Sequence, residues 1–258
     1  MDNSSHITKS LAAIMNIRYD FARAGSSTGE IKIEAIRRIF KIVAPVVSRI
    51  GGKLTRIMEE GISAVFENST EDALHAADEI FLAASASLSA EDISRLSIGI
   101  HYGEVYMGSV KYRDFVAPIV ISEGVYTAWH LCDAASRYDA RVLISDKAVE
   151  RVRSFENRFS SRKLGKVYLP SRKTELMLYD LFDSDQTDHK YSKKRGKLVF
   201  ETGVDLFIEG KYLQSRNYFI ELLRFDRNDK AAKKYIFMCD KAISGQQLSA
   251  GDKYLEIW

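Results

Sequence analysis

The stretch SRIGGKLTRIMEEGISAVF, residues 48–66, has the pattern of a tight β-hairpin that follows a helix. Its glycine pair is typical of a helix end, and the alternation over residues 62–66 indicates a strand. Gly61 suits a turn that needs a positive φ. The acidic pair at the tip, Glu59 and Glu60, has two interpretations. It is either a solvated turn or a pair of carboxylates that hold a hard cation at a strand end.

The composition indicates one sizeable folded domain with an appendage. The chain has 258 residues, of which 46% are hydrophobic and 11% aromatic. Its 2 cysteines, Cys132 and Cys239, lie far apart and lack metal-ligand spacing. This usage predicts a reducing compartment, here the cytoplasm, and no disulfide framework. No apolar run approaches about 20 residues and no signal-peptide pattern opens the chain, so we expect no membrane span.

Hydrophobic periodicity predicts an α+β fold around a mainly antiparallel sheet. The expected order is a strand at 10–17, a helix at 30–50, the hairpin at 53–66, a helix at 69–88, two strands joined by a turn at Gly103 within 95–110, a helix at 123–136, a strand and short helix at 140–152, and a hairpin at 163–182.

Several of these segments, in this order, resemble the catalytic domain of class III adenylate and guanylate cyclases. Residues 48–66 are similar to the family's glycine pair, Gly-Asp-Gly hairpin and following strand, and LSIGIHYGEVYMGSV (96–110) is close to its IGIHTGEV strand pair. SEGVYTAWHL (122–131) stands where the family has a Gly-Asp-x-Val-Asn-x-Ala-x-Arg-Leu helix, and RVLIS and KLGKVYLPSRKTELMLYDL match its closing strands. The resemblance implies a ferredoxin-like βαββαβ-type sandwich, with residues 1–186 as a cyclase-homology domain.

In that family a hairpin carboxylate and a first-strand aspartate hold two magnesium ions, which bind the triphosphate and activate the 3′-hydroxyl. The corresponding metal positions fall on Asn16 and Glu60, while Asp20 would need a shifted register. Asparagine is neutral, and glutamate reaches about one carbon further, which is enough to misplace a metal. The resemblance therefore implies degenerate metal positions and no bound cofactor, with Mg or Mn and ATP expected only if the chain is active.

The nucleotide-contacting positions also depart from the family. Its purine-selecting lysine falls on Arg56, and the partner of that lysine falls on Ile119, which cannot form a hydrogen bond. The asparagine and arginine that orient the ribose and stabilise the transition state fall on Tyr126 and His130. A neutral histidine lacks the fixed charge and fork of arginine. Packing roles for Tyr126 and His130 remain open alternatives.

The C-terminal quarter has a different pattern. The run HKYSKKRGK suggests a basic linker over 187–198, without the features of a nucleic-acid-binding site. Residues 199–258 resemble a tetratricopeptide helix hairpin followed by a third helix. Because a single repeat cannot bury its own apolar face, we expect this tail to dock on the cyclase-like domain or on a protein partner.

The favoured functional hypothesis is a pseudo-cyclase, which has lost catalysis and acts as a dimerising regulatory or interaction module in intracellular signalling. The alternative is an active or weakly active adenylate or guanylate cyclase that converts ATP or GTP to a cyclic nucleotide and pyrophosphate, either by itself or as half of a heterodimer. A nucleotide sensor without turnover is a third option. The expected partner is a second copy or another cyclase-like chain, and no nucleic acid is expected.

Overall fold

The structure, a computed structural model, describes residues 7–21, 28–59, 61–113, 115–169, 173–245 and 254–255. The strands are β1 (Thr8–Tyr19), β2 (Lys53–Met58), β3 (Gly61–Phe66), β4 (Leu96–Tyr112), β5 (Phe115–Ile121), β6 (Val142–Ser145), β7 (Ser161–Leu169) and β8 (Thr174–Leu181). The helices are α1 (Gly29–Arg49), α2 (Thr70–Ser87), α3 (Ala90–Ser94), α4 (Glu123–Arg137), α5 (Asp146–Val149), α6 (Phe155–Arg158), α7 (Thr187–Ile208), α8 (Tyr212–Phe225) and α9 (Lys230–Ile243).

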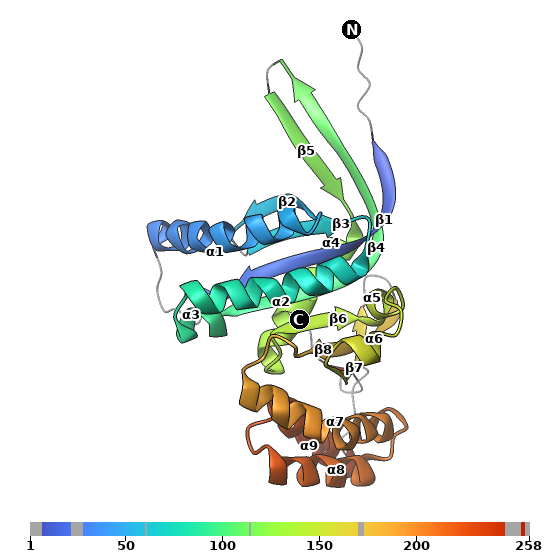
Figure 1. The fold of residues 1–258 in the computed structure, drawn as a ribbon. Helices are drawn as coiled ribbons and strands as arrows, with labels where there is room; N and C mark the ends of the chain where they lie inside the picture. Colours follow the sequence, from blue (N-terminus) through green and yellow to red (C-terminus); the bar gives the residue numbers. More distant parts are fainter. Residues whose placement is uncertain are drawn as a thin grey trace.

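The strands form an eight-stranded sheet with the order β2-β3-β1-β4-β6-β8-β7, and β5 pairs with the outer part of β4 (Figure 1). Only the β4–β6 pair is parallel among these ladders. The long β4–β5 hairpin projects away from the body, and the three C-terminal helices lie at the opposite end (Figure 1). The α+β class and the mainly antiparallel sheet are confirmed.

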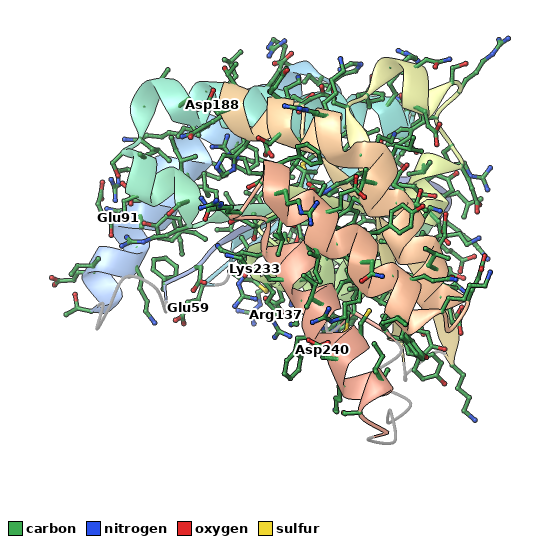
Figure 2. The ribbon with its side chains drawn as sticks, turned by 90° about the horizontal axis from the view of Figure 1, so that it is seen from below. Glu59, Glu91, Arg137, Asp188, Lys233 and Asp240 are labelled. Carbon is green, nitrogen blue, oxygen red and sulfur yellow. The ribbon has the colours of Figure 1, made fainter. Side chains whose placement is uncertain are left out.

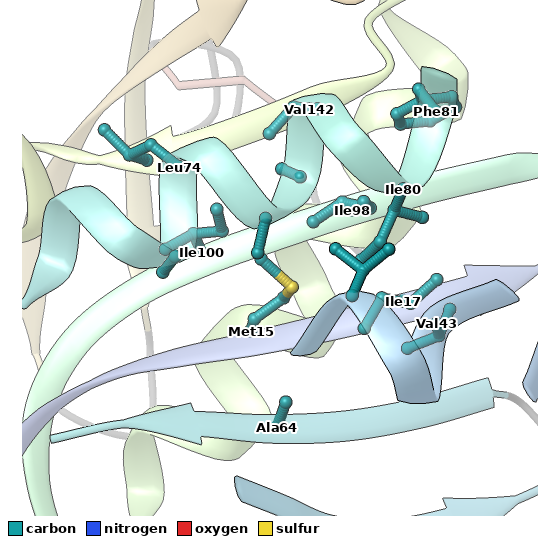
Figure 3. Close-up of a cluster of buried hydrophobic side chains, with 14 of the residues drawn as sticks. Met15, Ile17, Val43, Ala64, Leu74, Ile80, Phe81, Ile98, Ile100 and Val142 are labelled. Carbon is teal, nitrogen blue, oxygen red and sulfur yellow. The ribbon is translucent and has the colours of Figure 1, made fainter. Parts of the chain in front are cut away.

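Strand β1 lies in the middle of the sheet and is buried on both faces. Met15 and Ile17 point into the core beneath α1 and α2, together with Ile98 and Ile100 of β4 (Figure 3). Because successive side chains of a strand point to opposite faces, Asn16 points to the other face, where α4 lies. The alternation along β1 therefore separates an apolar core from the face that carries the candidate site.

The predicted turn at Gly103 is wrong. Strand β4 continues through this position, and Gly103 pairs with Ala12 of β1. The chain does not reverse there because the first residues of β1 extend the ladder beyond the core. The hairpin instead joins β4 to β5, with Tyr112 opposite Phe115.

The three tail helices share a hydrophobic core with the sheet. Phe200 of α7, Phe219 of α8 and Tyr235 of α9 are fully or almost fully buried, in one cluster with Leu164 and Val167 of β7. The Tyr235 hydroxyl donates a hydrogen bond to the carbonyl of Leu164, 2.9 Å away. The expectation that the tail docks on the domain is confirmed, and Figure 2 views the docked helices from below.

Residues 187–198 are not a linker between two elements. They form the first half of α7, which begins at Thr187. Lys193, in the middle of the basic run, is almost fully buried and pairs with Asp180 and Asp185 at 2.9 and 2.7 Å. The run belongs to a helix, and the buried carboxylate partners of Lys193 fix that helix against the sheet in a way that no local pattern could indicate.

A buried ionic cluster connects this helix to the sheet and to α9. Arg162 of β7 contacts Asp180 of β8 at 3.1 Å and also pairs with Asp229, which caps α9. Asp229 and Asp180 lower the cost of burying the guanidinium and raise the pKa of Arg162. Removing one partner of such a buried pair typically costs about 3–5 kcal/mol, so the cluster holds the tail in one orientation.

The described C-terminal residues lie against β7. The backbone N–H of Leu255 donates to the carbonyl of Lys166, 2.7 Å away, and the Leu255 side chain is buried in the same core as the tail helices. The Tyr254 hydroxyl contacts Glu175 of β8. These contacts place residues 254–255 along the outer edge of the sheet.

None of the helices in the described ranges has the length and apolarity that a transmembrane span requires.

Deleting residues 187–258 is expected to expose the sheet surface that α7 and α9 cover, which includes Leu164, Val167 and Leu178. An apolar patch of this kind favours association, so the truncated chain should be poorly soluble. If it remains soluble, it should melt at least about 5 °C lower than the full chain by calorimetry. An unchanged melting temperature with full solubility would contradict the shared core.

A partly buried carboxylate also lies close to the start of the tail. The Asp78 side chain on α2 is mostly shielded from water, and its Oδ1 has no hydrogen-bond partner among the described residues. Burial, with a further contribution from the negative charge of Asp183, raises the pKa of Asp78 to about 7. Lys190 of α7 and His75 of α2 oppose this shift only in part.

This shift predicts a pH-dependent stability. The folded state holds a proton on Asp78 between about pH 4 and pH 7, whereas the unfolded chain has released it, so the contribution of Asp78 to stability falls as pH rises through this window. Asp78→Asn should therefore be more stable than the wild type at pH 8, and this advantage should shrink toward pH 4, measured by urea unfolding. Glu221→Gln, an exposed change on α8, controls for the loss of one negative charge. Equal effects of the two substitutions at both pH values would refute the assignment.

Candidate functional site

A cavity of about 680 Å³ lies between the sheet and the N-terminal half of α4. This volume is within the range of about 300–1,000 Å³ that small-molecule sites occupy. Much of its lining is apolar, with Met58 of β2, residues 118–121 of β5, and Val125, Tyr126 and Trp129 of α4. Arg18, Thr55, Arg56, Ser63, Ser122 and Glu123 supply the polar lining.

Helix α4 is held unusually close to the sheet at this place. A Cβ atom on Gly99 of β4 would lie 2.1 Å from the carbonyl oxygen of Ala128, and one on Gly124 would lie 2.4 Å from Ile14. The Cys132 thiol donates to the carbonyl of Asn16 at 3.1 Å, and burial raises the pKa of this thiol to about 12. Cys132 therefore stays a neutral packing residue, and the glycines set the depth at which α4 lies.

Asn16 lies beneath the cavity and connects β1 to α4. Its side chain is fully buried, and Nδ2 donates to the carbonyl of Val125 at 2.8 Å. Ser63, its partner across the β1–β3 ladder, lines the cavity on the same face. Asn16 Oδ1, Ser63 Oγ and Trp129 Nε1 are buried atoms without a hydrogen-bond partner among the described residues. An unmet buried polar group costs about 1–3 kcal/mol, so three of them around one cavity are informative.

The described charged side chains that line the cavity are two arginines and one glutamate. Arg18 follows Asn16 by two residues on β1, therefore points to the same face, and pairs with Asp133 of α4. Arg56 is exposed on the edge strand β2 and has no ion pair with a described residue. Glu123 contributes a carboxylate where α4 begins, and Ser122 caps that helix by accepting from the N–H of Gly124 at 3.0 Å.

The structure brings most of the predicted site residues together. Arg56, Ile119 and Tyr126 line the cavity, and Asn16 lies under it. His130 lies one turn further along α4, outside the cavity lining, and burial lowers its pKa, so its ring is neutral at pH 7. Glu60 lies outside the described residues. Their proposed roles as degenerate positions stay predictions.

The site residues that were not predicted from the sequence include Arg18, Ser63 and Trp129. The period of two along β1 could have indicated Arg18, since it places this residue on the face of Asn16. Helical spacing could have indicated Trp129, three positions after Tyr126. Ser63 had no such signal because only its lack of a hydrogen-bond partner distinguishes it.

The described residues include no cluster of three or more His, Cys, Asp or Glu side chains that could hold a metal ion. The described polar side chains near Asn16 include the Ser63 hydroxyl and the Arg18 guanidinium, and the nearby carboxylate of Asp133 is already paired with Arg18. Divalent magnesium prefers carboxylate oxygens, so this group of residues does not fit a two-metal centre.

No protein-family model matches this chain. A curated relative, the terminal-differentiation-specific adenylate cyclase of Dictyostelium discoideum, is 21% identical over 225 residues. The match covers 84% of this chain but only 11% of the Dictyostelium protein.

The solved structures that this chain resembles are also nucleotide cyclases. A bacterial light-regulated adenylyl cyclase superposes with a TM-score of 0.59 at 13% identity, over 74% of this chain and 58% of that one. The chain has the class III nucleotide cyclase fold. A guanylyl cyclase domain from the fungus Blastocladiella emersonii, described as dimeric, superposes with a TM-score of 0.52 at 11% identity, over 67% of this chain and 96% of that one. The cyclase-like domain thus has neighbours among both adenylyl and guanylyl cyclases.

Asn16→Asp tests whether the buried position beneath the cavity must carry an uncharged side chain. The new carboxylate would face the Val125 carbonyl, and an unpaired buried charge of this kind should cost about 2 kcal/mol or more at pH 7.5. Burial raises the pKa of such a group, so the loss should shrink toward pH 4, where it is protonated. Urea unfolding at both pH values measures the effect. Asn228→Asp, the same change at an exposed position, is the control. A selective stabilisation of Asn16→Asp by millimolar Mg²⁺ would show that a metal site can be restored and would contradict this description.

Proposed function

We propose that this chain is a catalytically silent nucleotide cyclase homologue that acts as a dimerising regulatory or interaction module in intracellular signalling. The observation that carries the proposal is the state of Asn16. Its amide is neutral, fully buried and hydrogen-bonded to the Val125 carbonyl, at the position where the resemblance places a metal-binding carboxylate. Phosphoryl transfer of this type depends on cations that neutralise the attacking and leaving oxygens.

The other substituted positions support the same proposal. Ile119 presents no polar group to a purine edge, and an unpaired buried polar group on a ligand costs about 1–3 kcal/mol. Tyr126 contributes a large ring to the cavity wall where a small amide is expected. His130 is neutral and lies outside the lining, so it offers little transition-state charge. Losing one preorganised donor typically costs about 3–4 kcal/mol of barrier, and several losses combine here.

The β4–β5 hairpin supports the dimerising part of the proposal. The register places Tyr106, Val110, Ile119 and Ile121 on one face of this hairpin. All are exposed, Val110 to 50% and Ile121 to 65%. A contiguous exposed apolar face on a projecting arm favours association with another chain. A second copy or a related cyclase-like chain is the proposed partner, in line with the dimeric description of one structural neighbour.

The alternative proposal is a weakly active cyclase that works as half of a heterodimer. The similarity to cyclases in sequence and fold supports it, while the residues around Asn16 do not. In that case Mg or Mn with ATP or GTP would be required, and a partner chain would have to supply the missing groups.

A product assay separates the two proposals. The purified full chain with ATP or GTP and Mg²⁺ or Mn²⁺ should make no cyclic AMP or cyclic GMP above a heat-treated sample, because the two-metal centre is incomplete. Calorimetric titration with Mg–ATP should show weak or no binding. Turnover that Glu60→Ala abolishes would overturn the silent assignment and establish the alternative.

The oligomeric state tests the apolar hairpin face. Sedimentation at high micromolar concentration should show a dimer, and Val110→Glu should shift the equilibrium to monomer by at least tenfold in dissociation constant, since a charge would be buried in the interface. Lys111→Glu, on the neighbouring position and the opposite face, is the matched control. A monomeric wild type with no partner recovered, or equal effects of both variants, would argue against association through this face.

A further inference from the structure

We propose that the cavity beside α4 is a binding site for a flat organic monoanion, held without a divalent cation. The ligand would have an aromatic body and one singly charged carboxylate or phosphodiester group. The inference rests on the proposed function, because it assigns a ligand to a site in which the catalytic positions have changed.

The unmet hydrogen-bonding atoms give the first argument. Ser63 is 1% exposed, lines the cavity, and its hydroxyl has no partner among the described residues. Trp129 Nε1 is a buried donor in the same situation, and its ring also lines the cavity. Asn16 Oδ1 adds an unmet acceptor on the same face of the sheet. Buried polar groups in native proteins almost always have partners, and a ligand in this cavity would supply them for these atoms.

The shape and lining of the cavity give the second argument. Its volume of about 680 Å³ suits a small organic molecule rather than a bare ion. Trp129 and Tyr126 contribute aromatic surface from α4, and Ile119 and Met58 contribute apolar surface from the two hairpins. Aromatic side chains pack best against planar rings by offset stacking or edge contacts. A flat, mainly apolar body is therefore the best complement.

The charges give the third argument. Among the described lining residues are two guanidinium groups, Arg18 and Arg56, and one carboxylate, Glu123. Arg18 is already balanced by Asp133, whereas Arg56 has no ion pair with a described residue. Glu123 lies at the start of α4, so Arg56 on the edge strand is the guanidinium available to one anionic group of a ligand, and arginine binds carboxylate or phosphate through a two-point hydrogen bond. A triphosphate carries several charges and would need metal ions, for which the described residues provide no cluster.

The test uses the full chain in buffer with EDTA and isothermal titration calorimetry. The probes are 2-naphthoate, cyclic AMP and neutral 2-naphthamide, which separate a carboxylate, a cyclic phosphodiester and an uncharged ring. We expect at least one of the two anionic probes to bind. If the site prefers a carboxylate, 2-naphthoate should bind at least about tenfold more tightly than 2-naphthamide, its neutral counterpart. Arg56→Gln should weaken the anionic probe about tenfold or more, and Arg37→Gln, an exposed change on α1, should leave it unchanged.

Ser63→Ala gives a second readout that a merely structural serine would not produce. Removing an unmet hydroxyl should leave the melting temperature of the unliganded chain equal or slightly higher, yet reduce anion affinity several-fold. The inference is overturned if neither anion binds at millimolar concentration, if binding requires Mg²⁺, or if Arg56→Gln and Ser63→Ala leave the affinity unchanged. The product assay is independent: turnover would refute the silent assignment, whereas absence of binding without turnover would refute only the ligand.

Discussion

The close approach of α4 to the middle of the sheet is the contact on which the rest of the structure depends. Gly99 and Gly124 allow it, since a side chain at either position would collide with backbone or with Ile14. The Asn16 amide then joins β1 to α4 through the Val125 carbonyl. This contact brings residues of β2, β3, β5 and α4 around one cavity, and it also sets the surface of α4 on which the tail core is built.

If the chain is catalytically silent, as proposed, the same contact explains how its fold persists without a metal centre. Family-type catalysis would require a carboxylate at the Asn16 position, and a charge there would have to be balanced by bound cations. A neutral amide needs no such balance, since its N–H groups can donate to the helix backbone. The fold then no longer depends on a cation at this place. What remains is a neutral, partly apolar hollow with cationic side chains at its edge, Arg56 among them.

Much of the fold could be predicted from the sequence because the periodicities are strong. The alternation over 62–66 and the helical spacing over 30–50 correspond to β3 and α1, and the helix expected at 69–88 corresponds to α2. The turn at Gly103 was wrong because glycine alone does not show whether a neighbouring strand extends the ladder. The basic linker was wrong because the carboxylate partners of Lys193 come from β8 and the loop after it, near in sequence but outside any helical pattern. The family resemblance led to Arg56, Ile119 and Tyr126, whereas Ser63 became visible only through its unmet hydroxyl.

Residues 254–255, which lie along β7, affect the tendency of the sheet to add strands from other molecules. The main strand order of the sheet ends at β2 and β7, and each of these outer strands could recruit a strand from another molecule. On β7, the Leu255 backbone occupies the Lys166 carbonyl, and α7 packs over the neighbouring residues. On β2, Lys53 and Arg56 place cations on a short strand, which opposes strand addition. These two ends of the main strand order are thus protected from strand addition, one by coverage and the other by charge.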